Sequence, residues 1–301
     1  WQGRQTDRFI EEHHTILEAI QQKIGKDNVM YAPGSDFEGG NDIDRAVTMA
    51  RNADHIVLCL GEDAYCETLG NIGDLYIPEA QKELALRMAQ TGKPVSLVLV
   101  EGRPRLISQF EEQMDGVLMA YIPGNRGGDA IANVLFGDVN PSGKLPFTYP
   151  KYPNDLLTYD HKNTEDLGPG SGNVFDPQYP FGHGLSYTDF QYSNLTLSDS
   201  VLNENGSIEV QVEVTNSGNR TGKETVMMFV RDHYAKVVPP VKRLRDYTKV
   251  SLEPGESKVV TFKIDQGDLK YVGPENTWIL EPGSFTVIVG DKKHQFVLSK
   301  T

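Results

Sequence analysis

The sequence has few cysteines, no excess of positive charge and no long apolar run. Only two of its 301 residues are cysteines, which excludes a scaffold built on several disulfides. Its strongest apolar run, residues 95–100, is far shorter than the roughly 18 residues that span a bilayer. The formal net charge is −13 and the pI is about 5.0, which disfavours nucleic acid and anionic membranes as partners. What remains, 38% hydrophobic and 24% charged residues, is the composition of a folded globular protein.

No pattern in the sequence indicates a cofactor or a metal site. His13 and His14 are adjacent, so on a helix their side chains point in different directions, and His183 has no histidine or cysteine near it at metal-ligand spacing. No GxGxxG follows a first strand and no Walker pattern is present, which argues against a nucleotide-binding protein. The chain begins at Trp1 without a signal peptide, so the absence of a signal says nothing about location, and we expect a fragment or a processed product.

The first half of the sequence alternates helical patterns with short apolar runs. Apolar residues recur at helical spacing in residues 7–24, 41–52, 78–90 and 127–136. Short runs typical of strands lie between them, in residues 28–32, 55–60, 95–100 and 116–121. Strands that alternate with helices predict βαβ units and a parallel sheet covered by helices on both faces. We therefore predict a layered α/β sandwich domain over residues 1–160.

The pattern changes in the second half. Residues 150–186 are rich in Pro, Gly, Asn, Asp and Tyr, and residues 161–186 are predicted to form a linker. From residue 187 apolar residues recur with a period of two, in short runs separated by turns that contain Gly, Asn and Pro. These runs are residues 207–214, 225–230, 258–264, 283–289 and 294–298. Several short strands at this spacing predict an all-β sandwich of the fibronectin type III kind over residues 187–301.

The segment with the most chemical content is residues 61–68, directly after the apolar run 56–60. It carries three carboxylates, Glu62, Asp63 and Glu67. Open α/β sheets bind their ligands beyond the carboxyl ends of the strands, and a carboxyl group in such a crevice is a candidate acid or base. A solvated acidic loop without a function has the same composition, so the residues by themselves leave both interpretations open.

Seven motifs follow one another along nearly the whole chain. They are residues 1–3 (WQG), 61–68 (GEDAYCET), 123–128 (PGNRGG), 135–146 (LFGDVNPSGKLP), 179–187 (YPFGHGLSY), 242–247 (KRLRDY) and 252–257 (LEPGES). Together, and in this order, they resemble the C-terminal part of a family 3 glycoside hydrolase of the β-glucosidase or exo-glucanase type. Their order is more specific than any one of them.

The resemblance implies an enzyme in three parts. An N-terminal (β/α)8-like barrel supplies a nucleophilic Asp, an α/β sandwich supplies the acid/base Glu, and a fibronectin type III-like domain packs behind them. This chain resembles the second and third parts, so the barrel is expected as a partner that it lacks. The resemblance also implies retention of anomeric configuration, which needs two carboxyl groups about 5–5.5 Å apart. We expect a secreted or periplasmic enzyme without cofactor that removes terminal non-reducing β-D-glucosyl residues, with β-xylosides as the next choice.

The resemblance assigns roles to three residues. By its place in the motif Glu67 resembles the acid/base, and Glu62 is the alternative. If Glu62 has no catalytic role, we interpret it as a structural carboxylate that orients the loop. Trp1 resembles a tryptophan that flanks the leaving-group subsite, since an indole plane suits the apolar faces of sugars. The rival hypothesis is a non-catalytic carbohydrate-binding or assembly module derived from such an enzyme. The isolated chain is expected to be inactive, because it holds only one of the two carboxyl groups.

Overall fold

The computed structural model describes residues 13–37, 39, 42–155, 158–168, 174–203 and 206–299, which form two compact units. The first unit comprises the described residues up to 139 and residues 149–155. The second comprises residues 140–148 and the described residues from 158 onward. The domain boundaries at residues 160 and 186 stay a prediction. Among the described residues, no helix is both long and apolar enough to cross a bilayer.

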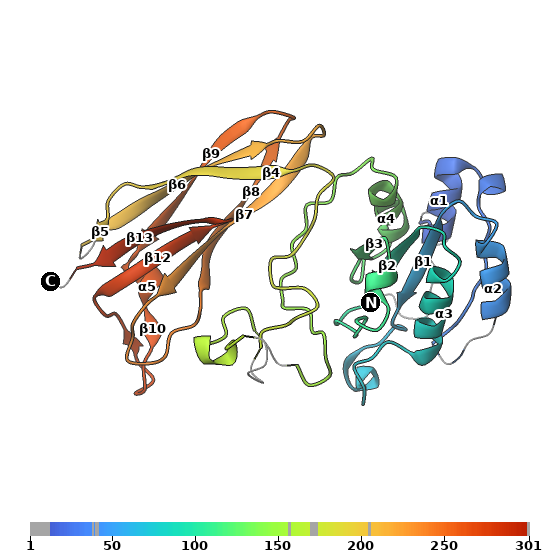
Figure 1. Ribbon diagram of the computed structural model, residues 1–301, viewed down its shortest axis with the longest axis horizontal. Helices are drawn as coiled ribbons and strands as arrows, with labels where there is room; N and C mark the ends of the chain where they lie inside the picture. Colours follow the sequence, from blue (N-terminus) through green and yellow to red (C-terminus); the bar gives the residue numbers. More distant parts are fainter. Residues whose placement is uncertain are drawn as a thin grey trace. The chain divides into compact units, whose positions relative to one another are not determined.

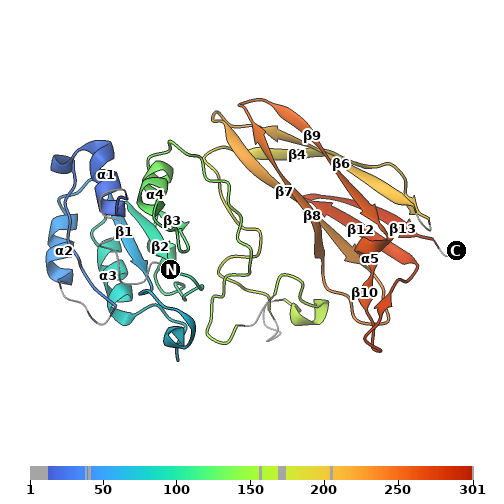
Figure 2. The same cartoon turned by 180° about the vertical axis from the view of Figure 1, so that it is seen from behind.

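The first unit is built on a three-stranded parallel sheet in the order β1-β2-β3 (Figure 1). Helix α1 packs against α4, and α2 packs against α3, so that the sheet has helices on both faces (Figure 2). The predicted α/β layers are therefore confirmed. The strands are β1 (Ile56–Gly61), β2 (Val95–Val100) and β3 (Gly116–Met119). The α-helices are α1 (Ile16–Ile24), α2 (Ile43–Ala50), α3 (Glu79–Ala89) and α4 (Gly127–Leu135), and short 3₁₀ turns are η2 (Lys26–Asn28), η3 (Glu67–Gly70) and η4 (Glu111–Gln113).

Burial explains why the central strand has no polar face. In β2, Leu97 and Val98 are successive residues that point to opposite faces, and both are fully buried. A strand covered by helices on both faces is apolar throughout rather than alternating. Helix α1 begins at a capping box, in which Thr15 and Glu18 satisfy each other's backbone N–H groups. Its buried Ile20 then packs with Ala132 of α4.

The strand predicted over residues 28–32 is wrong. Asn28 ends η2, and residues 29–34 have no regular secondary structure. Met30 and Tyr31 are 51% and 57% exposed. An apolar run becomes a strand only where a neighbour accepts its backbone hydrogen bonds, and no described strand pairs with this segment.

The second unit is a β-sandwich, as predicted. One sheet has the order β5-β13-β12-β7-β8, the other has the order β4-β6-β9, and a small hairpin joins β10 to β11. Its strands are β4 (Phe190–Leu197), β5 (Val201–Leu202), β6 (Ser207–Asn216), β7 (Gly222–Asp232), β8 (Arg243–Leu252), β9 (Ser257–Asp265), β10 (Tyr271–Val272), β11 (Trp278–Ile279), β12 (Gly283–Val289) and β13 (Lys292–Leu298). The short helices are η5 (Asn163–Glu165) and α5 (Gln266–Leu269).

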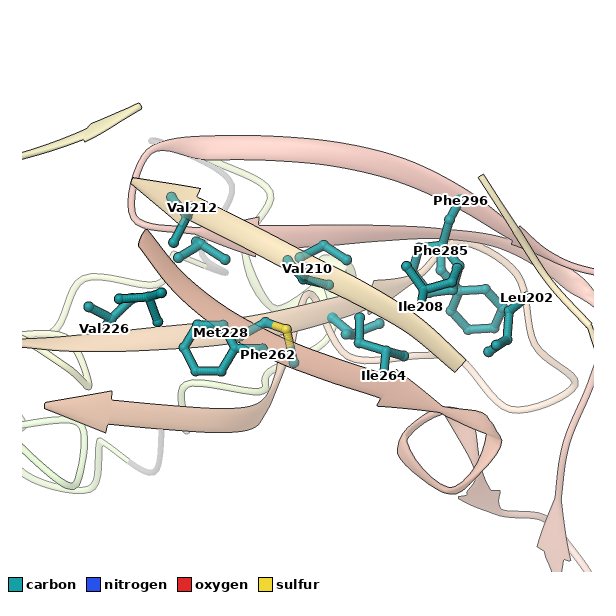
Figure 3. Close-up of a cluster of buried hydrophobic side chains, with 14 of the residues drawn as sticks. Leu202, Ile208, Val210, Val212, Val226, Met228, Phe262, Ile264, Phe285 and Phe296 are labelled. Atoms are coloured by element: carbon teal, nitrogen blue, oxygen red, sulfur yellow. The ribbon is translucent and has the colours of Figure 1, made fainter. Parts of the chain in front are cut away.

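The core of the sandwich comes from the inward residues of both sheets. Figure 3 shows Ile208 and Val210 of β6 and Ile264 of β9 among side chains of the facing sheet, such as Met228 and Phe285. In β6 every second residue is buried, which is the pattern of a strand with one solvated face. The period-two spacing in the sequence therefore located this core correctly.

Residues 140–148 and the aromatic segment before β4 pack onto the sandwich rather than onto the α/β unit. Leu145 exchanges backbone hydrogen bonds with Gly182 and His183, both at 2.8 Å. Tyr159 stacks on Phe181 with ring centroids 4.3 Å apart, and both rings meet the edge of Phe229 in β7. Tyr159 and Phe181 are thus packing residues of the second unit.

Two residues of β9 test how the sandwich is stabilised. Ile264 is fully buried, so Ile264→Ala should lower the free energy of unfolding of the sandwich by about 2–5 kcal/mol, through lost burial and the cavity left behind. Val259, on the same strand, is 62% exposed, and Val259→Ala should change it by less than about 0.5 kcal/mol. Urea unfolding followed by circular dichroism measures both. Equal losses for the two variants would contradict the assigned faces of β9.

Candidate active site

The loop that carries the predicted acid/base residues begins where β1 ends at Gly61. The Gly61 N–H donates to the side-chain oxygen of Gln81 at 2.9 Å, and the Gln81 amide donates back to the Gly61 carbonyl at 2.9 Å. The next residue, Glu62, donates its N–H to the Val100 carbonyl at 3.1 Å. A Cβ atom at Gly61 would lie 1.9 Å from that carbonyl, so the close approach requires glycine. The start of the loop is therefore fixed to both α3 and β2.

Glu62 is a buried carboxylate that two arginines hold. Its side chain is 7% exposed, and its Oε1 accepts hydrogen bonds from Arg103 Nε at 2.7 Å and from Arg105 Nη1 at 3.2 Å. Both arginines lie in the segment that follows β2, at the same edge of the sheet. A buried charge is tolerated when it is paired and hydrogen-bonded in this way. These are the contacts of a carboxylate that orients the loop.

The same two arginines also hold the far part of the loop. Arg103 Nη1 donates to the Gly70 carbonyl, and the guanidinium carbon lies 4.2 Å from the centroid of the Tyr65 ring. Arg105 donates to the Tyr76 carbonyl through Nε, at 3.1 Å, and through Nη2. The loop is thus closed by side chains that come from the segment after the neighbouring strand.

Glu67 has the opposite character. It opens the 3₁₀ turn η3 with a φ angle of 50°, a left-handed conformation that costs a residue other than glycine about 1–3 kcal/mol. Its side chain is exposed, and within the described part of the chain no hydrogen bond or ion pair involves its carboxyl group. The backbone therefore holds Glu67 in an unfavourable conformation while its carboxyl group stays unengaged.

A cavity of about 600 Å³ opens beside the loop. Glu62 and its two arginines supply much of its polar lining, and Phe37 and Ile72 are among its apolar residues. Glu67 is not one of the lining residues. The structure thus brings Glu62 to the cavity and leaves Glu67 outside its lining. Trp1 lies outside the described residues, so its subsite stays a prediction.

A second buried carboxyl group, Glu101, lies next to Arg105, which also pairs with Glu62. It is 1% exposed, and its Oε1 accepts from the Tyr149 hydroxyl at 2.8 Å and from the Arg105 N–H at 3.3 Å. Burial raises the pKa of Glu101 to about 7, and the neighbouring Glu62 charge adds to the rise, while the Tyr149 and Arg105 contacts oppose it. The site therefore contains a carboxyl group that changes charge near neutral pH.

Arg103, Arg105 and Glu101 were not predicted from the sequence. A signal was available, because residues 101–105 follow an apolar run in the same way that the acidic loop follows β1. The carboxyl ends of neighbouring parallel strands meet at one edge of the sheet. In the described part of the chain, no group of three or more His, Cys, Asp or Glu side chains is placed to hold a metal ion.

The fold and site define a protein with an α/β domain, which presents a carboxylate-rich loop at the ends of its strands, and a fibronectin type III-like sandwich. Residues 2–187 match the family model of the glycosyl hydrolase family 3 C-terminal domain, and residues 224–293 match that of the fibronectin type III-like domain. The chain belongs to glycosyl hydrolase family 3, which confirms the resemblance drawn from its motifs.

Known proteins similar to this chain are glycosidases by name. It is 37% identical to a β-xylosidase of Formosa agariphila, over 92% of this chain and 39% of that protein, and 35% identical to a periplasmic β-glucosidase of Salmonella typhimurium, over 92% and 41%. Among solved structures, a β-glucosidase from Erythrobacter marinus has a TM-score of 0.86 at 32% identity, over 94% of this chain and 43% of that one. A β-glucosidase from Listeria innocua in complex with isofagomine also gives 0.86, at 28% identity, over 94% and 42%. The chain spans about two fifths of the length of these relatives.

Gly61 tests how tightly the start of the loop is fixed. Gly61→Ala should destabilise the α/β unit by about 1–3 kcal/mol, because the added methyl group collides with the Val100 carbonyl and the chain must move apart. Gly73, in the same loop, has open space around it, so Gly73→Ala should change the stability by less than about 0.5 kcal/mol. Urea unfolding compares the two. A neutral Gly61→Ala would show that the contact is not rigid.

Glu101 should make the stability of the α/β unit depend on pH. Its folded-state pKa of about 7 lies above the ordinary value of 4.5, so the folded state binds the proton more tightly than the unfolded state. Stability is then greatest below about pH 4.5 and falls as the pH rises through 7, by up to about 3 kcal/mol at about 1.4 kcal/mol per pKa unit. Glu101→Gln should flatten this profile, and Glu112→Gln, at an exposed site, should not. Urea unfolding from pH 5 to 8 tests this, and parallel profiles for all three proteins would contradict it.

Proposed function

We propose that this chain is part of a retaining, exo-acting β-glucosidase, in which Glu67 is the general acid/base. The observation that carries the proposal is the state of Glu67. An exposed carboxyl group, without a partner among the residues that the structure describes, lies on a strained backbone, in the loop that follows a parallel strand. Strained residues cluster at functional sites, where the surrounding structure holds them. Membership of glycosyl hydrolase family 3 supports an acid/base role for this carboxyl group.

The contrast with Glu62 supports Glu67 over the alternative. Glu62 Oε1 is occupied by two guanidinium groups, and the side chain is almost completely buried. An acid/base must reach the glycosidic oxygen and later a water molecule. Glu62 would have to break two ion pairs to do so, whereas the Glu67 carboxyl group has no hydrogen bond or ion pair to a described residue that it would have to break.

In the proposed reaction, Glu67 donates its proton to the glycosidic oxygen as the bond to the leaving group breaks. A nucleophilic Asp of a barrel domain attacks the anomeric carbon, and Glu67 then removes a proton from the water that releases the sugar. A carboxyl group holds its proton near neutral pH when it is desolvated or lies beside another carboxylate. In the proposed enzyme, the barrel supplies the second carboxylate beside Glu67.

The proposed substrate is a terminal non-reducing β-D-glucosyl residue, with a β-xyloside as the second choice. Proteins named β-glucosidase and β-xylosidase are both similar to this chain, which supports the pair and not a choice between them. We further propose that Trp1 flanks the leaving group and that the enzyme is secreted or periplasmic. A similar protein from Salmonella typhimurium is named periplasmic.

Replacing Glu67 in an enzyme that joins this chain to its barrel tests the assignment. Glu67→Gln should slow hydrolysis of glycosides with poor leaving groups by about 10²–10⁴-fold, the usual contribution of general acid catalysis. Activated aryl glycosides need little protonation and should lose far less. Azide, which requires no general base, should partly restore turnover. Steady-state kinetics on the two substrate types measures these effects.

The matched variant is Glu62→Gln. It should slow poor leaving groups less than Glu67→Gln does and should show no azide rescue, because it removes the partner of Arg103 and Arg105 and loosens the loop while Glu67 itself remains. If Glu62→Gln shows the dependence on the leaving group and the azide rescue while Glu67→Gln does not, the acid/base is Glu62.

The isolated 301-residue chain should hydrolyse neither β-glucosides nor β-xylosides measurably, since the proposed nucleophile lies outside it. Mixing the chain with a separately produced barrel domain, and measuring release of an aryl leaving group, checks whether activity needs both parts. Hydrolysis by the chain alone would overturn this division of the carboxyl pair. A mixture that binds β-glucosides but never cleaves them would favour the non-catalytic module.

A further inference from the structure

One side chain, Arg103, touches the Glu67 loop at three separate points. Nε donates to the Glu62 carboxylate at the start of the loop, at 2.7 Å. Nη1 donates to the carbonyl of Gly70. Gly70 is the last residue of the turn η3, and Glu67 is the first. Between these points, the guanidinium lies 4.2 Å from the centroid of the Tyr65 ring. Arg103 therefore brackets the segment that contains Glu67 from both ends.

The chemistry of arginine suits this task. A guanidinium is planar and donates in several fixed directions, so it binds a carboxylate with one edge and a carbonyl with another while its face lies on an aromatic ring. A lysine ammonium keeps the charge but lacks the plane and the second edge. Tyr65 is itself closely packed on two sides, because a Cβ at Gly70 would lie 2.4 Å from its ring and a Cβ at Gly102 would lie 2.3 Å from its hydroxyl oxygen.

Among the described residues, no side-chain contact holds Glu67 in place. Its carboxyl group has no partner within the described residues, and its left-handed backbone conformation is intrinsically unfavourable. The position of its side chain then depends on the two ends of the segment being fixed. We propose that Arg103 is a positioning residue for catalysis, which holds the segment 62–70 closed and so places Glu67 for proton transfer.

Arg105 has a different role, although it shares Glu62. Its other side-chain contact is the Tyr76 carbonyl, beyond the segment that contains Glu67, and its side chain is 10% exposed compared with 27% for Arg103. Its backbone N–H also donates to the buried Glu101. Arg105 thus belongs to the base of the loop and to the core of the domain, and only Arg103 reaches the turn that carries Glu67.

Hydrogen–deuterium exchange on the 301-residue chain tests the clamp without any catalysis. In Arg103→Gln, amides of residues 62–71 should exchange at least about ten times faster, while amides of β2 keep their rates. Arg103→Lys should lie between this variant and the unchanged protein. The matched control is Arg87→Gln, which removes an arginine paired with Asp44 and Glu83 in the same domain, away from the loop. Unchanged exchange of residues 62–71 in both Arg103 variants would overturn the proposal.

Kinetics then separates positioning from general stability, and this step rests on the proposed role of Glu67. In the barrel-joined enzyme, Arg103→Gln should lower kcat at least about tenfold more for poor leaving groups than for activated aryl glycosides. It should add little to the loss in a Glu67→Gln background, because both changes remove the same proton transfer. If Arg103→Gln lowers kcat equally on both substrate types, and by the same factor in the Glu67→Gln background, Arg103 is not a positioning residue. A Glu67→Gln enzyme without any dependence on the leaving group would overturn the proposed function, and the exchange result would still decide the clamp.

Discussion

The ion pairs of Glu62 with Arg103 and Arg105 are the interaction on which the geometry of the site depends. A carboxylate that is 7% exposed is stable in the fold only because two guanidinium groups accompany it. Removing one partner of such a buried pair typically costs about 3–5 kcal/mol, because the other charge is left unpaired. The pairs join the end of β1 to the segment after β2, and the loop between β1 and α3 must follow that connection.

This arrangement divides the acidic residues of one short loop into two kinds. Glu62 is held by two ion pairs and fixes the loop. Glu67, five residues later, has a strained backbone, and its carboxyl group has no partner among the described residues. The two states are connected, since Glu67 can be held in a left-handed conformation only if the flanking segment cannot relax. The stability of the buried pairs thus offsets the strain at the exposed residue.

The sequence predicts the layers well and the contacts within the site poorly. Apolar runs and helical spacing located β1, β2 and β3, and the period of two located β6, β9 and β12, because burial follows these patterns directly. The charged strand β8 was not predicted, since only its last residue is buried and its sequence shows no clear apolar alternation. The run at Val29 and Met30 was wrongly predicted as a strand, because no described strand pairs with it. The acidic loop was found from its place after a strand. Its arginine partners were not, because the contact requires β1 and β2 to be in register, with Gly61 opposite Val100.

That register also explains why position 61 needs glycine and why arginines of the segment after β2 reach the loop. Because Gly61 lies against the Val100 carbonyl, the segments that follow β1 and β2 leave the sheet side by side. Glu62 of the first segment therefore pairs with Arg103 and Arg105 of the second. Gln81 fills the remaining hydrogen bonds of Gly61 from α3, so the start of the loop has no alternative path. The loop is therefore fixed at its start, and the contacts of Arg103 with Glu62 and Gly70 fix both ends of the segment that contains Glu67.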